Sequence, residues 1–216
     1  MFNKKTYKKN VKFFLKKHEA SYEILTGTCP VMISAPHSVS QTRNGERKPA
    51  EPYTGALAKM LHDELSCSVI CKTRNLKDDA NYDKNSPYKN DLAKYVQQNG
   101  IICVIDLHQL SDSRNVMIDI GTNCMKNLNN NLEPLNIILE AFSKRNLGIL
   151  QIDEPFAASG KYTVSAFISS SCDIPCVQLE INSRLLRPAF FNIKVRKVYE
   201  ALVEIIQNLS LSVKNR

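Results

Sequence analysis

Two histidines and a glutamate follow or close three apolar segments, and these residue types could form a metal-dependent hydrolase site. The segments are residues 31–36, 101–107 and 174–179, and the residues that follow them are His37, His108 and Glu180. Apolar runs of this length are typical of buried strands in a parallel sheet. In an open α/β sheet the ligand crevice lies at the carboxyl ends of the strands. Two histidines and a carboxylate at that edge would suit zinc and a hydrolytic reaction.

The histidines also have structural explanations. A loop histidine such as His37, taken alone, is more often structural or exposed than a ligand. Asp106 and His108 are two residues apart, so in a strand they share a face. Asp106 could therefore orient the ring of a metal-bound His108, or the pair could simply end a strand with no metal present.

The carboxylates leave alternatives open as well. Glu180 lies in an apolar strand, where a charge is costly unless it is paired or close to an ion. It could be a catalytic base, or it could form a salt bridge with Arg184 or Arg187. Glu51, at the start of a predicted helix, could balance the helix dipole or supply the third, carboxylate zinc ligand, and Glu46 competes for that ligand role.

Further polar residues follow predicted strand ends and could bind a substrate. Arg74, Asn81, Arg114 and Arg184 are in such positions, and an arginine can hold a carboxylate through paired hydrogen bonds. Tyr162 follows a flexible loop that could close over a site. For each of these residues a surface, turn or packing role is the simpler alternative.

Helical and strand patterns alternate along the chain. Apolar spacing and turn residues predict helices over residues 1–18, 51–65, 91–99, 132–145, 162–170 and 188–209, and strands over residues 21–27, 30–35, 68–73, 101–107, 115–120, 148–152 and 174–180. Residues 37–49 are expected to be a polar loop. This alternation predicts a three-layer α/β/α fold of the phosphorylase/hydrolase-like kind, with a mostly parallel central sheet.

Length and composition narrow the classes of protein. The 216 residues fit one domain, 1–216, whose basic segment 1–18 forms a first helix or arm. The formal net charge is +8, but residues 1–17 hold seven lysines and no acid. Because most of the positive charge is confined to this segment, a nucleic-acid partner is not expected.

No apolar run is long enough to span a bilayer or to serve as a signal peptide, so we expect no membrane association and a cytoplasmic location. The seven cysteines are expected to be reduced core residues. The oligomeric state is left open.

Taken in order, five short motifs resemble the N-formylglutamate amidohydrolase family, which is related to the zinc carboxypeptidases. They are Ala35-Pro36-His37-Ser38, Ala50-Glu51-Pro52-Tyr53-Thr54, Thr73-Arg74 with Asp79-Ala80-Asn81, Asp106-Leu107-His108 and Gln178-Leu179-Glu180-Ile181-Asn182. They cover residues 30–190, and the ordered set is more specific than any one motif. Two positions differ from the family's pattern. Val39 stands where the family often has glycine, and Tyr82 stands where the family has arginine.

The resemblance implies a Zn²⁺ ion held by His37, Glu51 and His108, with Glu180 as the general base. Arg74 or Arg114 would then stabilise the oxyanion or hold a substrate carboxylate, with Asn81, Tyr162 and Arg184 as further substrate-binding residues. The implied reaction is cleavage of an amide bond in an N-acyl amino acid, a γ-glutamyl compound or a peptide that carries a carboxylate. The rival hypothesis is a non-catalytic α/β domain that binds an anionic ligand.

Overall fold

The computed structural model describes residues 1–187 and 193–212 and is built on a seven-stranded sheet. The strands are β1 (Tyr22–Leu25), β2 (Cys29–Ala35), β5 (Cys67–Lys72), β6 (Cys103–Leu110), β7 (Ile118–Gly121), β8 (Leu150–Ile152) and β9 (Cys176–Asn182). Their order across the sheet is β1-β5-β2-β6-β9-β7-β8. The central strands β5, β2, β6 and β9 run parallel, whereas β1 is antiparallel to β5 and β7 is antiparallel to β9.

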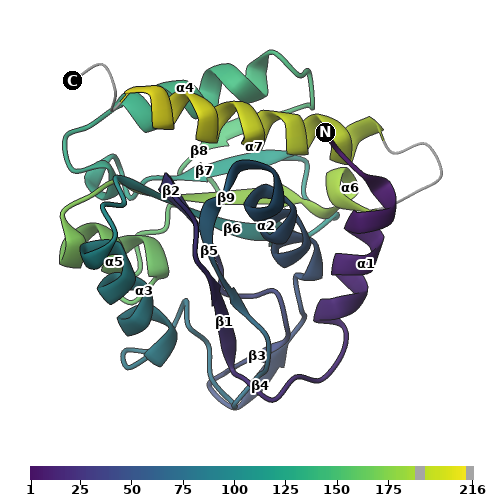
Figure 1. Ribbon diagram of the computed structural model, residues 1–216, viewed down its shortest axis with the longest axis vertical. Coiled ribbons are helices and arrows are strands. Elements are labelled where there is room, and N and C mark those ends of the chain that lie inside the picture. The colour runs from purple at the N-terminus through teal and green to yellow at the C-terminus, as the bar shows by residue number, and fades with distance from the viewer. Residues whose placement is uncertain (188–192, 213–216) are drawn as a thin grey trace.

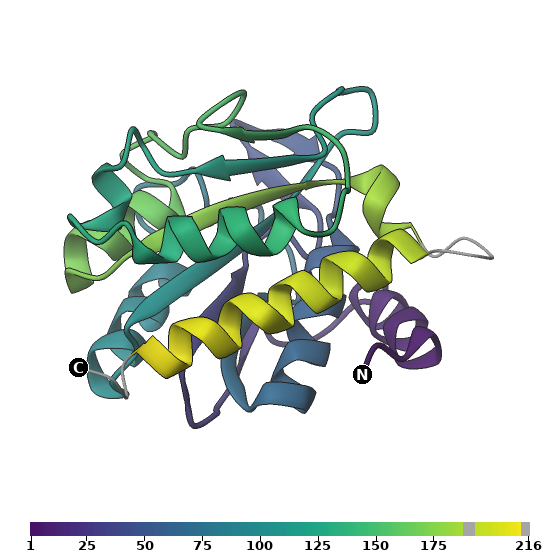
Figure 2. The same cartoon turned by 90° about the horizontal axis from the view of Figure 1, so that it is seen from above.

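Helices cover both faces of this sheet (Figure 1). They are α1 (Lys4–Phe14), α2 (Pro52–Leu65), α3 (Pro87–Gln98), α4 (Glu133–Ser143), α5 (Val164–Cys172), α6 (Ser183–Leu186) and α7 (Ile193–Ser212), with a short 3₁₀ helix, η1 (Lys126–Leu128). The larger core lies under α1, α2, α4 and α7, and the smaller core lies under α3 and α5. Helices α4 and α7 run side by side (Figure 2). The predicted three-layer fold with a mostly parallel sheet is therefore confirmed.

The central strands are apolar because both of their faces are covered, which explains why the sequence shows continuous apolar runs there. Along β6, Ile105 and Leu107 belong to the larger core, while Val104 belongs to the smaller one. On the smaller-core face, the residues that follow Val104 are polar, namely Asp106 and His108. The same change occurs on β9, where Cys176 is followed on that face by Gln178 and Glu180. One face of the sheet thus becomes polar toward the carboxyl ends of its strands.

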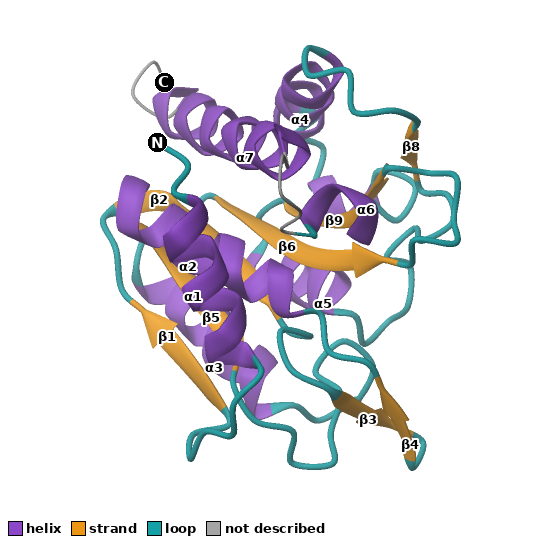
Figure 3. Cartoon of the chain, turned by 90° about the vertical axis from the view of Figure 1, so that its right-hand side faces the viewer, coloured by secondary structure: helices purple, strands orange, loops and turns teal. Residues whose placement is uncertain are grey.

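The loop expected over residues 37–49 contains a small hairpin instead. Strands β3 (Gln41–Arg43) and β4 (Glu46–Lys48) pair antiparallel, apart from the main sheet (Figure 3). Asn44 and Gly45 form the turn with φ values of 52° and 80°, as expected for an Asn-Gly hairpin turn. The alternating apolar pattern that normally signals strands is missing here, because the hairpin packs little hydrophobic surface.

The basic N-terminal segment is a packed helix. Tyr7, Val11 and Phe14 of α1 are buried against α2, while the lysines face outward. The close approach requires a glycine on α2, because a Cβ on Gly55 would lie 2.6 Å from ring carbons of Phe14. The predicted C-terminal helix begins at Ile193, and residues 188–192 of that prediction lie outside the described residues.

All seven cysteines are free thiols. Four of them are buried in the strands, as expected for core residues, whereas Cys29 and Cys172 are half-buried and Cys124 is exposed. Among the described residues, no helix has the length and apolar character needed to cross a membrane.

Candidate metal centre

Strand register places three polar side chains next to one another on the smaller-core face. His108 on β6 pairs with Glu180 on β9, and Glu180 pairs with Asp119 on β7. All three are at most 8% exposed. Glu180 lies within β9 rather than at its end, because the strand continues to Asn182. Its carboxylate is therefore fixed beside His108 by the sheet itself.

His37 and Glu51 reach the same place from outside the sheet. His37 lies in the turn that follows β2, and Glu51 is the residue that precedes helix α2. The backbone N–H of Glu51 donates to the carbonyl of His37 (2.8 Å), which joins the two segments. The side chain of Glu51 does not form the capping hydrogen bond to the first backbone N–H groups of α2. Its Oε2 accepts instead from the backbone N–H of Gln109 (2.8 Å), so the carboxylate points away from the helix and toward the end of β6.

The three predicted ligands converge. One ligand atom from each of His37, Glu51 and His108 lies within 4.8 Å of the other two. Glu51 Oε1 is 3.0 Å from His37 Nδ1, and Glu51 Oε2 is 3.6 Å from His108 Nδ1. Ligand atoms around a tetrahedral zinc ion are roughly 3.3–3.5 Å apart, given zinc–ligand distances of about 2.0–2.2 Å. The two measured distances bracket this spacing, so His37, Glu51 and His108 are close enough together to share one zinc ion.

Each imidazole is oriented by an aspartate on its other nitrogen. His37 Nε2 is 2.9 Å from Asp79 Oδ1, and His108 Nε2 is 3.0 Å from Asp106 Oδ2. When the neutral rings donate these Nε2–H groups, the Nδ1 lone pairs face Glu51. This arrangement of a carboxylate behind a metal-binding histidine is common in zinc sites.

The electrostatics of the cluster favour a bound cation. Burial alone would lower the pKa of His37, but the carboxylates of Glu51 and Asp79 raise it to about 9. Burial likewise opposes a charged His108, yet Asp106 and Glu51 raise its pKa well above the usual value. Burial alone would raise the pKa of Glu51, but the two rings lower it to about 2. The buried carboxylates thus hold positive charge at this place, on the two protonated rings. A divalent ion bound between neutral rings would supply that positive charge instead.

Glu180 differs electrostatically from the other carboxylates. Burial raises its pKa to about 7, and the charge of Glu51 adds to this shift while His108 opposes it. Gln178 Nε2 donates to Glu180 Oε1 (3.1 Å). The alternative role as a salt-bridge partner is not what the structure shows, because Arg187 pairs with Asp112 and the Arg184 side chain is exposed. A carboxyl group that titrates near neutral pH can both accept and release a proton.

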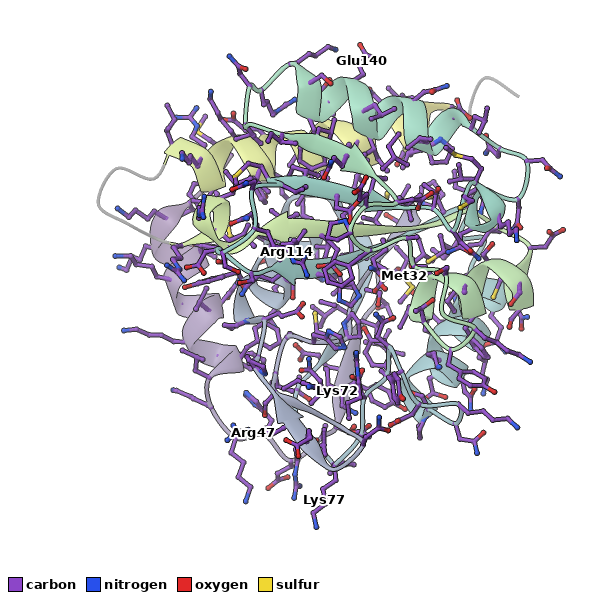
Figure 4. All side chains as sticks on the ribbon, turned by 180° about the vertical axis from the view of Figure 1, so that it is seen from behind. Met32, Arg47, Lys72, Lys77, Arg114 and Glu140 are labelled. Atoms are coloured by element: carbon purple, nitrogen blue, oxygen red, sulfur yellow. The ribbon has the colours of Figure 1, made fainter. Side chains whose placement is uncertain are left out.

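The cluster lies at the base of a cleft of about 1020 Å³. Four of the predicted catalytic and substrate-binding residues line this cleft, namely Glu180, Arg114, Asn81 and Tyr162. Arg114 lies near the middle of the face shown in Figure 4, with its guanidinium 4.9 Å from the centroid of the Phe156 ring. Asn81 lines the wall but is engaged structurally, since its Oδ1 accepts from the backbone N–H of Val164 (2.7 Å).

Arg74, Arg184 and Glu46 are not among the residues that line the cleft. The backbone N–H groups of Thr73 and Arg74 donate to the Ser21 carbonyl, which turns this segment toward the N-terminal part of the chain. Arg74 Nη1 then donates to the Glu19 carbonyl (3.2 Å). These positions argue against the predicted contacts of Arg74 and Arg184 with substrate. Glu46 is exposed on β4, whereas Glu51 lies beside both histidines, so of the two candidate carboxylates only Glu51 is placed where it could share an ion with them.

Two residues of the site were not singled out from the sequence. Asp79 is completely buried and bridges His37 to Arg43, whose Nη2 is 2.8 Å from Asp79 Oδ2. Burial would raise the pKa of Asp79, but His37 and Arg43 hold it well below the usual range. Arg43 also lies over the ring of Tyr82, 4.8 Å from its centroid. Asp79 falls in the Asp79-Ala80-Asn81 motif, which was the available signal, whereas Arg43 has none in the sequence.

Comparisons with known proteins relate the chain to several solved structures. No protein-family model matches it, and no curated protein matches its sequence. N-formylglutamate amidohydrolase from Ralstonia eutropha JMP134 superposes with a TM-score of 0.64 at 10% identity, over 91% of this chain and 99% of the other. A bacteriophage poly-gamma-glutamate hydrolase gives 0.57 at 16% identity, over 90% and 92%. The zinc-free form of a protein named YNDL gives 0.53 at 14%, over 90% and 94%.

These superpositions establish a shared fold. The chemistry has to be argued from the site itself. The fold expected from the five motifs is thus confirmed: this chain has the fold of N-formylglutamate amidohydrolase, with His37, Glu51 and His108 gathered at the carboxyl edge of its central sheet.

Proposed function

We propose that this protein is a zinc-dependent hydrolase that cleaves an amide bond in an N-acyl amino acid, a γ-glutamyl compound or a peptide that bears a carboxylate. The observation that carries this proposal is the convergence of His37, Glu51 and His108 beside the buried carboxyl group of Glu180. Two of the structures that share the fold are named as hydrolases of glutamate-containing amides, and a third is named as a zinc-free form.

The chemistry follows from the positions of the side chains. Zinc at such a site acts as a Lewis acid that polarises a carbonyl and makes water more acidic. Glu180 accepts the proton of the attacking water and passes it to the leaving nitrogen, so that an amide and water become a carboxylic acid and an amine. A pKa near 7 suits both transfers. Asp79 and Asp106 keep the histidine rings in place during the reaction.

Arg114 is the cleft arginine best placed to recognise the charge on a substrate. Arg43 is already paired with Asp79. Arg114 has a ring contact with Phe156 but no ion pair with a carboxylate of the described residues. Its guanidinium can therefore hold a substrate carboxylate or stabilise the oxyanion that forms on the scissile carbonyl. Tyr162, on the opposite loop, would contact the rest of the substrate.

The variant Glu180→Gln tests the assignment of the base. It preserves size and hydrogen bonding but cannot accept a proton. We expect zinc content and melting temperature to match the wild type, while turnover falls by about 10²–10⁴-fold. The measurements are elemental analysis, thermal unfolding and an assay on N-acyl glutamate and γ-glutamyl amides.

Three outcomes can be distinguished. Loss of zinc from Glu180→Gln would make Glu180 a ligand and require Glu51 to be reassigned. Normal turnover with a lower melting temperature would make Glu180 structural. If the wild-type protein binds no stoichiometric zinc after zinc supplementation and cleaves none of these amides, the rival role as a non-catalytic, anion-binding domain is favoured.

A further inference from the structure

A second cavity, separate from the metal centre, is lined by cationic side chains. This basic cavity has a volume of about 660 Å³, within the range of about 300–1,000 Å³ that is usual for ligand sites. Its lining contains no aspartate or glutamate. The five cations that line it are Lys16, Lys17, Arg47, Lys48 and Arg74. Phe14, Val39 and Thr73, which are largely buried, form part of its wall.

Three segments distant in sequence build the cavity and hold one another in place. They are the chain just after α1, the β3–β4 hairpin and the loop that follows β5. The backbone N–H of Thr42 on the hairpin donates to the Asp78 carbonyl (3.0 Å). On the other side, Thr73 Oγ1 donates to the Ala20 carbonyl (2.7 Å). Figure 4 shows Arg47 on the hairpin, well below Arg114 of the cleft.

The positive charge of the basic cavity is not neutralised within the part of the chain that the structure describes. None of its five cations forms an ion pair with a carboxylate there, although Lys59, Lys72 and Arg43 nearby in the sequence all do. Like charges gathered around one concavity repel one another and raise the local concentration of anions. A ligand with several negative charges would relieve that repulsion.

The basic cavity adjoins the catalytic cleft. Residues 48–50 line both of them and lead directly to the metal ligand Glu51. A ligand chain that leaves the cleft past this segment enters the basic cavity. A chain with one carboxylate per repeating unit would present charge to successive cations along this path.

From this continuity we infer that the basic cavity binds the distal carboxylates of an extended acidic substrate, a chain of amide-linked carboxylic acids whose scissile bond lies in the cleft. This inference rests on the proposed function and names its substrate class. It predicts a preference for long acidic chains that weakens at high salt, because salt screens exposed charges.

The test compares chain lengths in charge-reversed variants. The double variant Lys17→Glu/Arg47→Glu alters the basic cavity, and neither residue lines the cleft. The control Lys8→Glu/Lys9→Glu changes the net charge equally on the exposed face of α1. The substrates are γ-linked glutamate oligomers of two units and of about eight units. For the cavity variant we expect KM for the long oligomer to rise about tenfold, with kcat and the KM of the dimer unchanged and with the control variant close to wild type.

Binding to metal-free protein separates this inference from the proposed function. A fluorescently labelled long oligomer should bind the metal-free wild type, and binding should be lost in the cavity variant even if no amide is cleaved. The inference is overturned if the cavity variant and the control weaken binding equally, if dimer and long oligomer are affected alike, or if a single-stranded oligonucleotide of equal charge competes as well as the unlabelled oligomer.

Discussion

Each histidine of the candidate metal centre has one nitrogen held by an aspartate and the other turned toward Glu51. For His108 this partner is Asp106, two residues earlier on the same strand. Removing a ligand and removing the residue that orients it should lower zinc affinity by different amounts. We expect His108→Ala to abolish zinc binding and activity, because it removes a ligand. Asp106→Asn should lower zinc affinity by roughly 10–100-fold while leaving the site intact.

Zinc affinity measured by competition with a chromophoric chelator would check this order. Equal zinc affinity in the wild type and in His108→Ala would exclude His108 as a ligand. Equal loss in both variants would place Asp106 in direct contact with the metal instead.

The raised pKa of Glu180 predicts the pH dependence of turnover. The base is active only when it is ionised, so kcat/KM should fall as the pH drops through its pKa. Burial raises that pKa to about 7, and a zinc ion bound nearby would lower it. The acidic limb should therefore lie at or below neutral pH. A kcat/KM that stays constant from about pH 8 down to about pH 5 would contradict the role of Glu180 as a general base.

At the residue level, the sequence predicted the convergence of three candidate ligands that stand beside strand or helix ends. His37, Glu51 and His108 could be named because apolar runs and a helix start mark their positions. Asp79 was missed because it lies in the irregular segment after β5, where no periodicity predicts the direction of a side chain. Arg74 was placed at the site because it follows a strand, but hydrogen bonds to Ser21 and Glu19 turn it away.

At the level of elements, α3 contributes a buried lysine that joins two walls of the cleft. Lys89 Nζ donates to the carbonyls of Asp83 (2.7 Å) and Tyr162 (2.5 Å), and burial lowers its pKa to about 8. Lys89→Met would leave both part-buried carbonyls without this donor, at a cost of about 1.5–3 kcal/mol for each lost hydrogen bond to a charged group. We expect a lower melting temperature and a higher KM, because Tyr162 would no longer be held over the cleft.

Lys94→Met, on the exposed face of the same helix, is the matched control. It should change neither quantity. Thermal unfolding together with steady-state kinetics distinguishes the two variants. An unchanged KM in Lys89→Met would show that the hydrogen bond from Lys89 does not position Tyr162.

The elements differ in how well the sequence predicts them. The central strands were predicted to within about three residues of their observed ends, because strands covered on both faces need continuous apolar runs. The β3–β4 hairpin was missed, since its strands Gln41–Arg43 and Glu46–Lys48 contain no apolar residue and only Asn44-Gly45 signals the turn. The strand order and the antiparallel direction of β7 depend on contacts between distant segments, so no local pattern encodes them.

For the whole molecule, the candidate metal centre joins parts of the chain that are far apart in sequence. The turn after β2, the start of α2, the loop after β5 and the ends of β6 and β9 all meet there. An ion that binds the folded state alone stabilises it in proportion to the logarithm of its concentration over the dissociation constant. Zinc should therefore raise the melting temperature of the wild type and leave that of His108→Ala unchanged.

A zinc-edge anomalous difference map from crystals grown with zinc tests the central claim most directly. We expect one strong peak roughly 2.0–2.2 Å from Nδ1 of His37, Nδ1 of His108 and the Glu51 carboxylate, with Glu180 near the peak but outside bonding distance. A peak bound elsewhere, or full zinc occupancy with any of these three side chains turned away, would contradict the account.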